Sequence, residues 1–210
     1  MNFFINCNNL FSENLKKFNN LKNYFIMNIM NLSVEEKNTI KTLFKEMRAQ
    51  LAPYFEKRNV QFSNPQLFTF LSYCPSALAI ASDRVVDESE KQIIELIGMY
   101  MNVDKMVNME FLEMMSIAPE PENCLTNEEF NAKVAAELLY VCENMEQFEE
   151  NFVQAVKAML KFDSNPKGDT SMTKSFVTMM NAIIDNNTAE NKEDEKTKLI
   201  ALFKRLDIEV

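Results

Sequence analysis

The chain has 210 residues, 47% of them apolar, and a formal net charge of −9, which together indicate a packed globular protein that repels the phosphate backbone of nucleic acids. It contains no His, so catalytic sites of the Ser-His-Asp and Cys-His classes and zinc sites that use His are excluded. It has only two Gly, Gly98 and Gly168, which excludes phosphate-binding loops and favours an all-α fold over a β-rich one.

The first 32 residues differ in charge from the rest of the chain. Lys16, Lys17 and Lys22 stand against Glu13, so this segment carries +2 and the remaining residues −11, which together give the total of −9. Two interpretations remain open: an amphipathic basic helix that lies on a membrane or a partner, and a poorly ordered extension upstream of a later start. We favour the extension. The apolar residues at the spacing of one helix face are Phe11, Leu15, Phe18, Phe25 and Ile29.

Capping signals mark the first helices of the remaining chain. The box that Ser33 opens predicts a helix over residues 34–55, which Pro53 bends or ends. The next helix is predicted to begin at Asn64, because a cap that proline follows suits a first helical turn. We expect Pro75 to break this second helix into two pieces.

The middle of the chain is predicted to alternate helices with loops. A short Met-rich helix is expected over about 104–116. The segment 118–123 contains two prolines and is therefore the clearest linker. Before these, a capping box that Asp87 opens predicts a helix with an inward stripe of Ile93, Ile94, Ile97 and Met101.

Four further helices are predicted in the second half. Thr126 caps the first, whose inward residues are Phe130, Val134, Leu138 and Val141. Asn144 starts the second, with the cleanest stripe of the chain at Met145, Phe148, Phe152, Val156 and Met159. A turn-rich loop at 164–169 precedes a helix over 172–184, and the last helix has its stripe at Leu199, Ile200, Phe203 and Leu206. The prediction is thus one all-α domain over residues 33–210, a compact array of seven or eight helices.

The cysteines and the hydropathy bear on the compartment. Cys7, Cys74, Cys124 and Cys142 form no spacing typical of a metal site, so we expect free thiols in a reducing environment. The chain has no apolar stretch near the roughly 18 residues that span a bilayer and no export signal at its start. The expected location is the cytoplasm.

The densest set of acidic residues lies between Ala81 and Glu90. Asp83, Asp87 and Glu90 are candidate ligands of a divalent cation, Ca²⁺ or Mg²⁺, because such ions prefer several carboxylate oxygens. The spacing does not match an EF-hand. The competing interpretation, which the residues alone favour, is that Asp87 caps a helix and Glu90 completes its capping box.

Two other features have a functional and a structural interpretation. Six methionines between Met99 and Met115 could line a groove for a partner helix, although methionine at helical spacing more often belongs to the core. The acidic run 189–195 is interpreted as a solvated first turn of the last helix rather than as a second metal site.

The residues from Ala81 to Ile97 resemble the tellurite-resistance TerB-like family of small helical bacterial proteins. The family signature is a loop Asp-Gly-x-[Val/Ile]-x-x-x-Glu that leads into a helix, and Asp83, Val86 and Glu90 stand at its matching positions. Arg84 departs from the family glycine, which puts the loop geometry in doubt. The resemblance implies an all-α cytoplasmic domain associated with stress or tellurite resistance, with acidic loop residues suspected of binding metal and no established reaction.

The leading functional hypothesis is therefore a non-enzymatic TerB-like domain. It would act through a protein partner and through a divalent cation at the loop from Asp83 to Glu90. The alternative is a helical adaptor with a Met-rich groove and no metal. An enzyme that works through carboxylates alone is a third hypothesis, for which the sequence indicates no catalytic residue.

Overall fold

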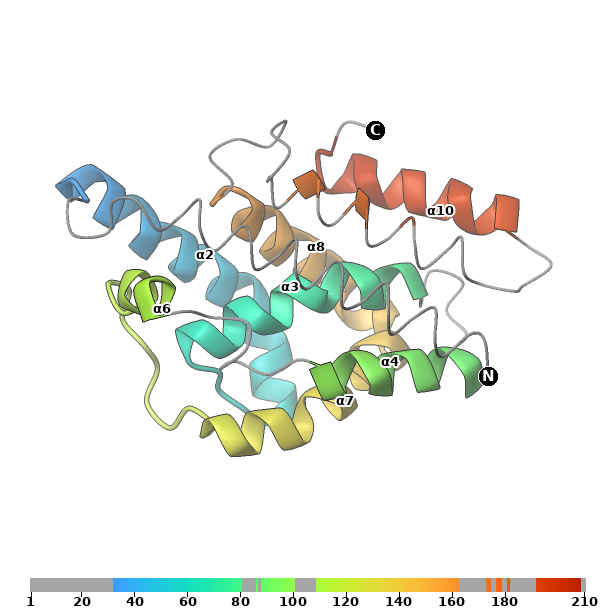
Figure 1. The fold of residues 1–210 in the computed structure, drawn as a ribbon, viewed down its shortest axis with the longest axis horizontal. Coiled ribbons are helices and arrows are strands. Elements are labelled where there is room, and N and C mark those ends of the chain that lie inside the picture. Colours follow the sequence, from blue (N-terminus) through green and yellow to red (C-terminus); the bar gives the residue numbers. More distant parts are fainter. Residues whose placement is uncertain are drawn as a thin grey trace.

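Helices account for most of the residues that the structure describes. The computed structural model describes residues 32–80, 86, 88–100, 109–162, 173–174, 177–178, 181 and 192–208. These residues contain no strand, which confirms the predicted all-α fold. The helices (Figure 1) are α2 (Val34–Arg58), α3 (Asn64–Ile80), α4 (Glu88–Tyr100), α6 (Met109–Met115), α7 (Asn127–Glu143), α8 (Met145–Leu160) and α10 (Lys192–Arg205).

Two of the predicted capping boxes form as expected. At the start of α2, the Ser33 hydroxyl accepts the Glu36 amide at 3.2 Å, and the Glu36 carboxylate accepts the Ser33 amide at 2.7 Å. At the start of α7, Thr126 and Glu129 repeat this reciprocal pair at 3.2 and 2.8 Å. Each box supplies acceptors for backbone N–H groups that have no partner within the helix.

The predicted break of the second helix at Pro75 is wrong, and the first helix does not end at Pro53. Pro53 lies inside α2, which continues to Arg58, and Pro75 lies inside α3, which is unbroken. A proline within a helix removes one hydrogen bond and costs about 3 kcal/mol. The residues around Pro75 are buried among other helices, and this packing offsets the local cost.

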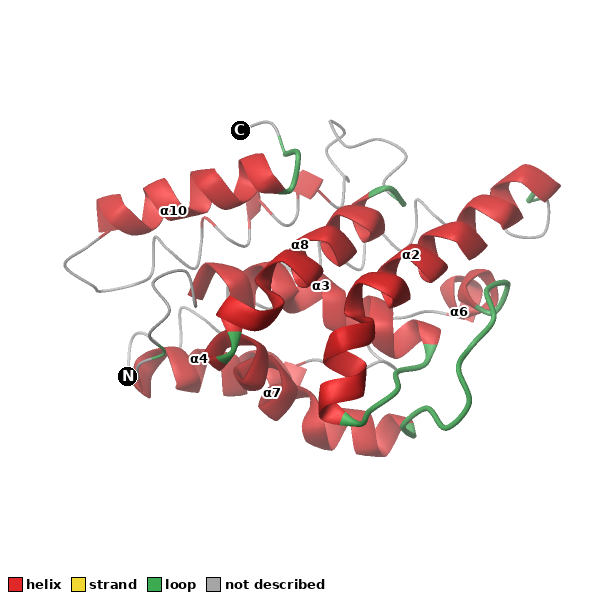
Figure 2. Ribbon diagram, turned by 180° about the vertical axis from the view of Figure 1, so that it is seen from behind, coloured by secondary structure: helices red, strands yellow, loops and turns green. Residues whose placement is uncertain are grey.

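Helix α3 lies at the centre of the fold. Its described side chains from Asn64 to Ala79 are all buried or half-buried, and it packs against α4, α6, α7, α8 and α10. A helix that is apolar on every side must be covered on every side. Figures 1 and 2 show α3 between the other helices, with α2 and α8 on the side that faces the viewer in Figure 2.

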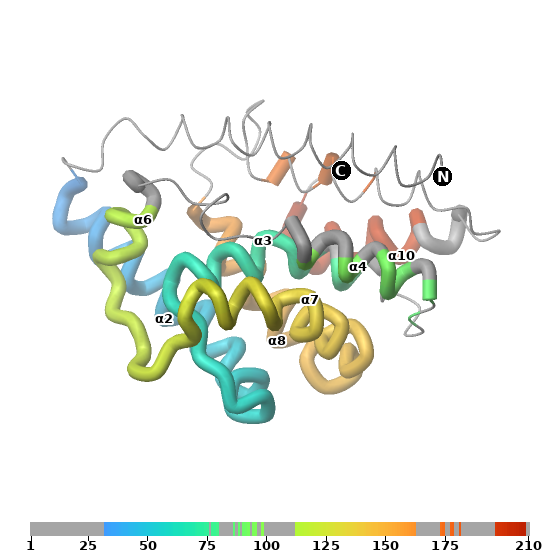
Figure 3. The backbone as a smooth tube through the Cα atoms, turned by 60° about the horizontal axis from the view of Figure 1, so that its bottom comes forward, coloured from blue at the N-terminus to red at the C-terminus, as the bar shows by residue number. Residues whose placement is uncertain are grey.

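Four of the other described helices form two packed pairs. α2 packs along α8, and α4 packs along α7. The α4–α7 contact is unusually close at Gly98, where a Cβ atom would lie 2.3 Å from the Cβ of Ala135. This contact explains why a helix interior contains glycine, which is otherwise unfavourable there. Figure 3 shows α2 and α4 towards opposite ends of the molecule, with α3 and α7 between them.

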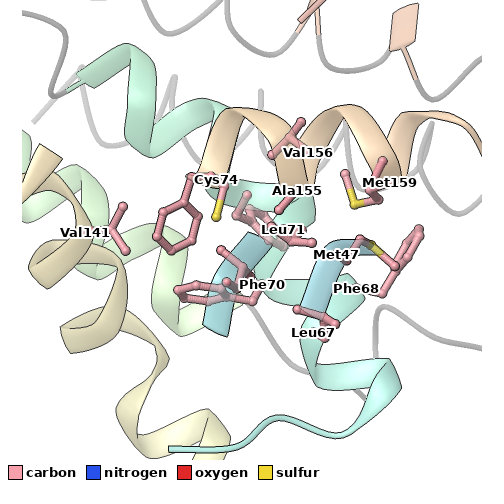
Figure 4. Packing of buried hydrophobic residues seen from close by; sticks show 14 of the residues in the cluster. Met47, Leu67, Phe68, Phe70, Leu71, Cys74, Val141, Ala155, Val156 and Met159 are labelled. Atoms are coloured by element: carbon pink, nitrogen blue, oxygen red, sulfur yellow. The ribbon is translucent and has the colours of Figure 1, made fainter. Parts of the chain in front are cut away.

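Aromatic rings fill the centre of the core. The Tyr54 ring lies 5.8 Å from that of Phe70, 5.9 Å from that of Phe148 and 5.2 Å from that of Phe152, as measured between ring centroids. These contacts join α2, α3 and α8. Figure 4 shows side chains from α2, α3, α7 and α8, such as Met47, Cys74, Val141 and Val156, gathered in this core.

The predicted apolar stripes were largely correct in the second half of the chain. All four inward residues predicted for α7 and all five predicted for α8 are buried. The prediction that Ile200 of α10 faces inward was wrong, because its side chain is 46% exposed while that of its neighbour Leu199 is buried. The predicted helix over 172–184 and the loop 164–169 fall mostly or wholly outside the described residues, as do residues 1–31.

Candidate functional site

The predicted cation site lies at the start of α4. Asp83 and Asp87 are outside the described residues, so their convergence with Glu90 stays a prediction. Glu90 lies in the first turn of α4 and is half-buried. In the part of the chain that the structure describes, no group of three potential metal ligands gathers at one point.

Glu90 lies beside the end of α7. Burial is the main cause that raises the pKa of the Cys142 thiol to about 12, and the carboxylates of Glu90 and Glu143 add to it. Because Gly98 contacts Ala135 while Glu90 lies near Cys142, α4 and α7 run antiparallel. Two carboxylates from neighbouring helices therefore lie at the same end of the α4–α7 pair.

The remaining charged residues of this turn are solvated. Lys91 Nζ lies 2.7 Å from Glu88 Oε1, and the Glu88 side chain is 84% exposed. This hydrogen bond is the main cause that raises the pKa of Lys91, with a smaller contribution from Glu143. Glu88 thus has the expected place of an acidic residue at the positive end of a helix.

Two of the six methionines that were predicted to line a groove are buried. Met114 and Met115 of α6 are buried, with exposed fractions of 4% and 0%. They belong to the core rather than to a surface for a partner helix. The other four methionines lie outside the described side chains, so the rest of that hypothesis stays a prediction.

A buried polar cluster that sequence reasoning missed joins α2 to α7. Glu137 is 4% exposed, and its Oε2 accepts a hydrogen bond of 2.7 Å from the Tyr54 hydroxyl. Arg58 holds the same carboxylate with two bonds, of 2.8 Å from Nε and 2.9 Å from Nη2. The Arg58 guanidinium also lies 4.0 Å from the ring centre of Tyr140.

The charges and hydrogen bonds of this cluster stabilise the contact between α2 and α7. Burial is the main cause that raises the pKa of the Tyr54 hydroxyl, which therefore stays protonated and donates to Glu137. The bond to Glu137 raises the pKa of Arg58, which stays charged. The sequence held a signal for this site, because Glu137 falls on the apolar face of α7, beside Val134 and Leu138.

A second buried polar residue fixes the linker at 118–123. Asn64, at the start of α3, donates from Nδ2 to the carbonyl oxygens of Met115 and Ala118 at 3.0 and 2.9 Å. Its Oδ1 accepts from Arg48 at 2.6 Å, and its backbone amide donates to Glu120 at 2.8 Å. One side chain thus holds α2, α3 and the linker together.

An open hollow of about 660 Å³ lies beside the first half of α2. On one side stands Lys161, which follows α8 and pairs with Glu46 at 2.9 Å. Val34, at the start of α2, is 77% exposed there. The lining residues are Val34, Glu35, Asn38, Thr39, Thr42, Leu43, Glu46 and Lys161.

No described helix combines the length with the apolar character that crossing a membrane requires. The three cysteines among the described residues, Cys74, Cys124 and Cys142, are free thiols. Comparisons of the chain with known protein families, with curated proteins and with solved structures found no match.

Proposed function

We propose that this chain is a non-enzymatic helical domain of the TerB-like type, which acts through protein contacts and binds a divalent cation at the loop that Asp83 opens. The observation that supports it best is that the carboxylates of Glu90 and Glu143 both contribute to the raised pKa of Cys142, which places both at the same end of the α4–α7 pair. Oxygen-rich, negatively charged loops are the sites that Ca²⁺ and Mg²⁺ prefer. We also propose a role in stress or tellurite resistance, which rests on the resemblance to the TerB-like family alone.

The described interior supports a scaffold role. Its buried carboxylate, Glu137, is bound on both oxygens by α2, and its buried amide, Asn64, is bound by the linker and Arg48. These groups hold helices together, and their hydrogen bonds would have to break before they could act on a substrate. We therefore place the function at the surface, in the acidic loop and the contacts around it.

The cation part is tested by titrating the full chain with Ca²⁺ and, separately, with Mg²⁺. Binding to the folded state should raise the melting temperature and shift the NMR signals of residues 83–90. Asp87→Asn and Glu90→Gln should each remove at least half of the rise. Glu88→Gln is the matched control, because Glu88 is exposed and paired with Lys91, and it should keep the response.

Two outcomes would contradict the cation site. The first is a melting temperature and a set of loop signals that neither ion changes. The second is an equal response in the Glu88→Gln and Glu90→Gln variants, which would indicate general screening of an acidic surface. Either result would leave the helical scaffold and its protein contacts as the proposal.

A further inference from the structure

Three lysines form a row along one face of the first half of α2. Lys37, Lys41 and Lys45 follow one another at intervals of about one helical turn, and all three side chains are exposed. The row is about 12 Å long, since a helix rises about 1.5 Å per residue. It lies on the end of α2 that extends beyond the other helices in Figure 2.

This lysine row has no carboxylate beside it. The positions three and four residues before and after each of the three lysines hold no Asp or Glu. Among the described residues, no carboxylate forms an ion pair with any of the three. Several lysines elsewhere on the surface do pair with carboxylates, and these pairs are Lys91–Glu88, Lys157–Asp207 and Lys161–Glu46. The lysine row is therefore a concentration of unneutralised positive charge on an acidic protein.

The lysine row destabilises the helix that carries it. Like charges four residues apart on a helix repel each other, as Lys41 does with both Lys37 and Lys45. Solubility does not explain the row, because the chain already carries −9 and each lysine brings it closer to neutral. An anionic partner would neutralise the three charges and give the arrangement a use.

A single acidic helix fits the lysine row better than a membrane or a nucleic acid does. Apart from Val34, the exposed side chains from 34 to 49 are polar, charged or small, so this face has little to insert into a bilayer. A membrane or a duplex would also approach the rest of the domain, whose excess of negative charge repels it. One helix contacts the row alone, because salt screens charges beyond about 8 Å.

We propose that the lysine row of α2 is the docking surface for an acidic helix of a partner protein, whose carboxylates recur at intervals of one turn. Each carboxylate then lies opposite one lysine, and the contact is ionic, reversible and weakened by salt. The inference rests on the protein contacts of the proposed function, for which it names the kind of partner. It does not depend on the cation site.

The experiment is an NMR titration of the labelled full chain with a synthetic helical peptide. The peptide has Glu at every fourth position of a sequence rich in Ala and Gln, and its control has Gln at those positions. We expect the Glu peptide to shift the amide signals of residues 37–49 at low salt and the Gln peptide to leave them unchanged. Salt at about 0.5 M should weaken the binding of the Glu peptide.

Two double variants locate the contact. Lys41→Gln with Lys45→Gln removes two charges from the lysine row and should lower the affinity for the Glu peptide at least about fivefold. Lys57→Gln with Lys133→Gln removes the same charge from exposed positions outside the row and should lower the affinity less than about twofold. All four substitutions are at exposed positions, so both variants should melt close to the original chain.

Three results would overturn the proposal. The first is an absence of shifts with the Glu peptide, or equal shifts with the Gln peptide. The second is an equal loss of affinity in the two double variants, which would mean that net charge alone attracts the peptide. The third is a response of the lysine row to vesicles of phosphatidylserine and phosphatidylcholine but not to the peptide, which would assign it to membranes. None of these results alters the response of residues 83–90 to Ca²⁺ or Mg²⁺, so failure here is distinct from failure of the cation site.

Discussion

The two halves of α2 belong to one helix but have different surroundings. From Met47 to Arg58 the helix is fixed by the aromatic core and by the Glu137 cluster, which binds Tyr54 and Arg58. From Val34 to Glu46 it has few buried residues and borders the open hollow.

This difference separates stability from recognition along a single helix. The second half stabilises the fold through contacts that leave little surface free, and the first half leaves a surface free because its contacts are few. Regions with few buried contacts also open at low free-energy cost. The first half of α2 can therefore open locally without unfolding of the whole domain.

The largest expected effect comes from breaking the cluster that fixes the second half. Glu137→Ala leaves the buried Tyr54 hydroxyl without an acceptor and removes the counterion of Arg58. We expect it to lower the free energy of unfolding by about 4 kcal/mol, as measured by urea denaturation. Arg58 keeps some contact with water, since its side chain is 30% exposed, which limits the loss.

Two controls sharpen this test. Glu46→Ala removes the pair with Lys161 at the first half, where both side chains are exposed, and should cost less than about 1 kcal/mol. Glu137→Gln keeps an acceptor for Tyr54, so its cost in unfolding free energy should lie between those of Glu137→Ala and Glu46→Ala. If Glu137→Ala and Glu46→Ala have equal effects, the two halves of α2 do not differ as described.

The next largest effect is expected from truncating a buried apolar side chain in the second half of α2, compared with an exposed one in the first half. Leu51 is fully buried in the second half, and Leu51→Ala should cost about 3 kcal/mol because it leaves a cavity. Val34→Ala truncates an apolar side chain in the first half and should cost less than about 0.5 kcal/mol. Thermal or urea unfolding of both variants provides the comparison. A cost above about 1 kcal/mol for Val34→Ala would mean that its side chain is covered in solution.

The sequence predicted α7 and α8 better than it predicted α3. The stripes of α7 and α8 were correct because each helix has one apolar face, and the start of α7 is also marked by the capping box of Thr126. The break at Pro75 was wrong because the described side chains of α3 are buried or half-buried on all sides, so its neighbours stabilise it as a continuous helix. Local rules for proline do not include such tertiary contacts.

Sites that depend on contacts between distant parts of the chain were also not predicted from the sequence. Glu137 was missed because no local motif marks its partners, which lie 79 and 83 positions away at Arg58 and Tyr54. A carboxylate on an apolar helix face was the one available signal. The hollow was missed because it requires the end of α8 to lie beside α2, which no sequence pattern indicates. The carboxylates Asp83 and Asp87 stay a prediction from the motif alone.

The cap of the first half gives a smaller effect than Glu137→Ala or Leu51→Ala. Ser33→Ala removes the hydroxyl that accepts the Glu36 amide, a change that typically costs about 1 kcal/mol of helix stability. Because few contacts hold this half of α2, part of that cost should appear as local fraying rather than global unfolding. Hydrogen exchange of the amides at 35–39 should therefore rise more than the denaturation midpoint falls. Thr126→Ala, at the same motif on α7, should instead lower the midpoint.

The same cap gives a pH dependence with a defined sign. The Ser33 backbone amide is the main group that lowers the pKa of Glu36 below its ordinary value of 4.5, and the Ser33 hydroxyl adds to it. A lowered pKa in the folded state means that the stabilisation is complete above pH 4.5 and is lost as the pH falls through the folded value. The protection of the amides at 35–39, which compares their exchange rate with the intrinsic rate at the same pH, should thus fall on acidification in the original chain. Glu36→Gln should exchange faster at neutral pH and respond less to acid, and an unchanged acid response would show that other carboxylates control this end of α2.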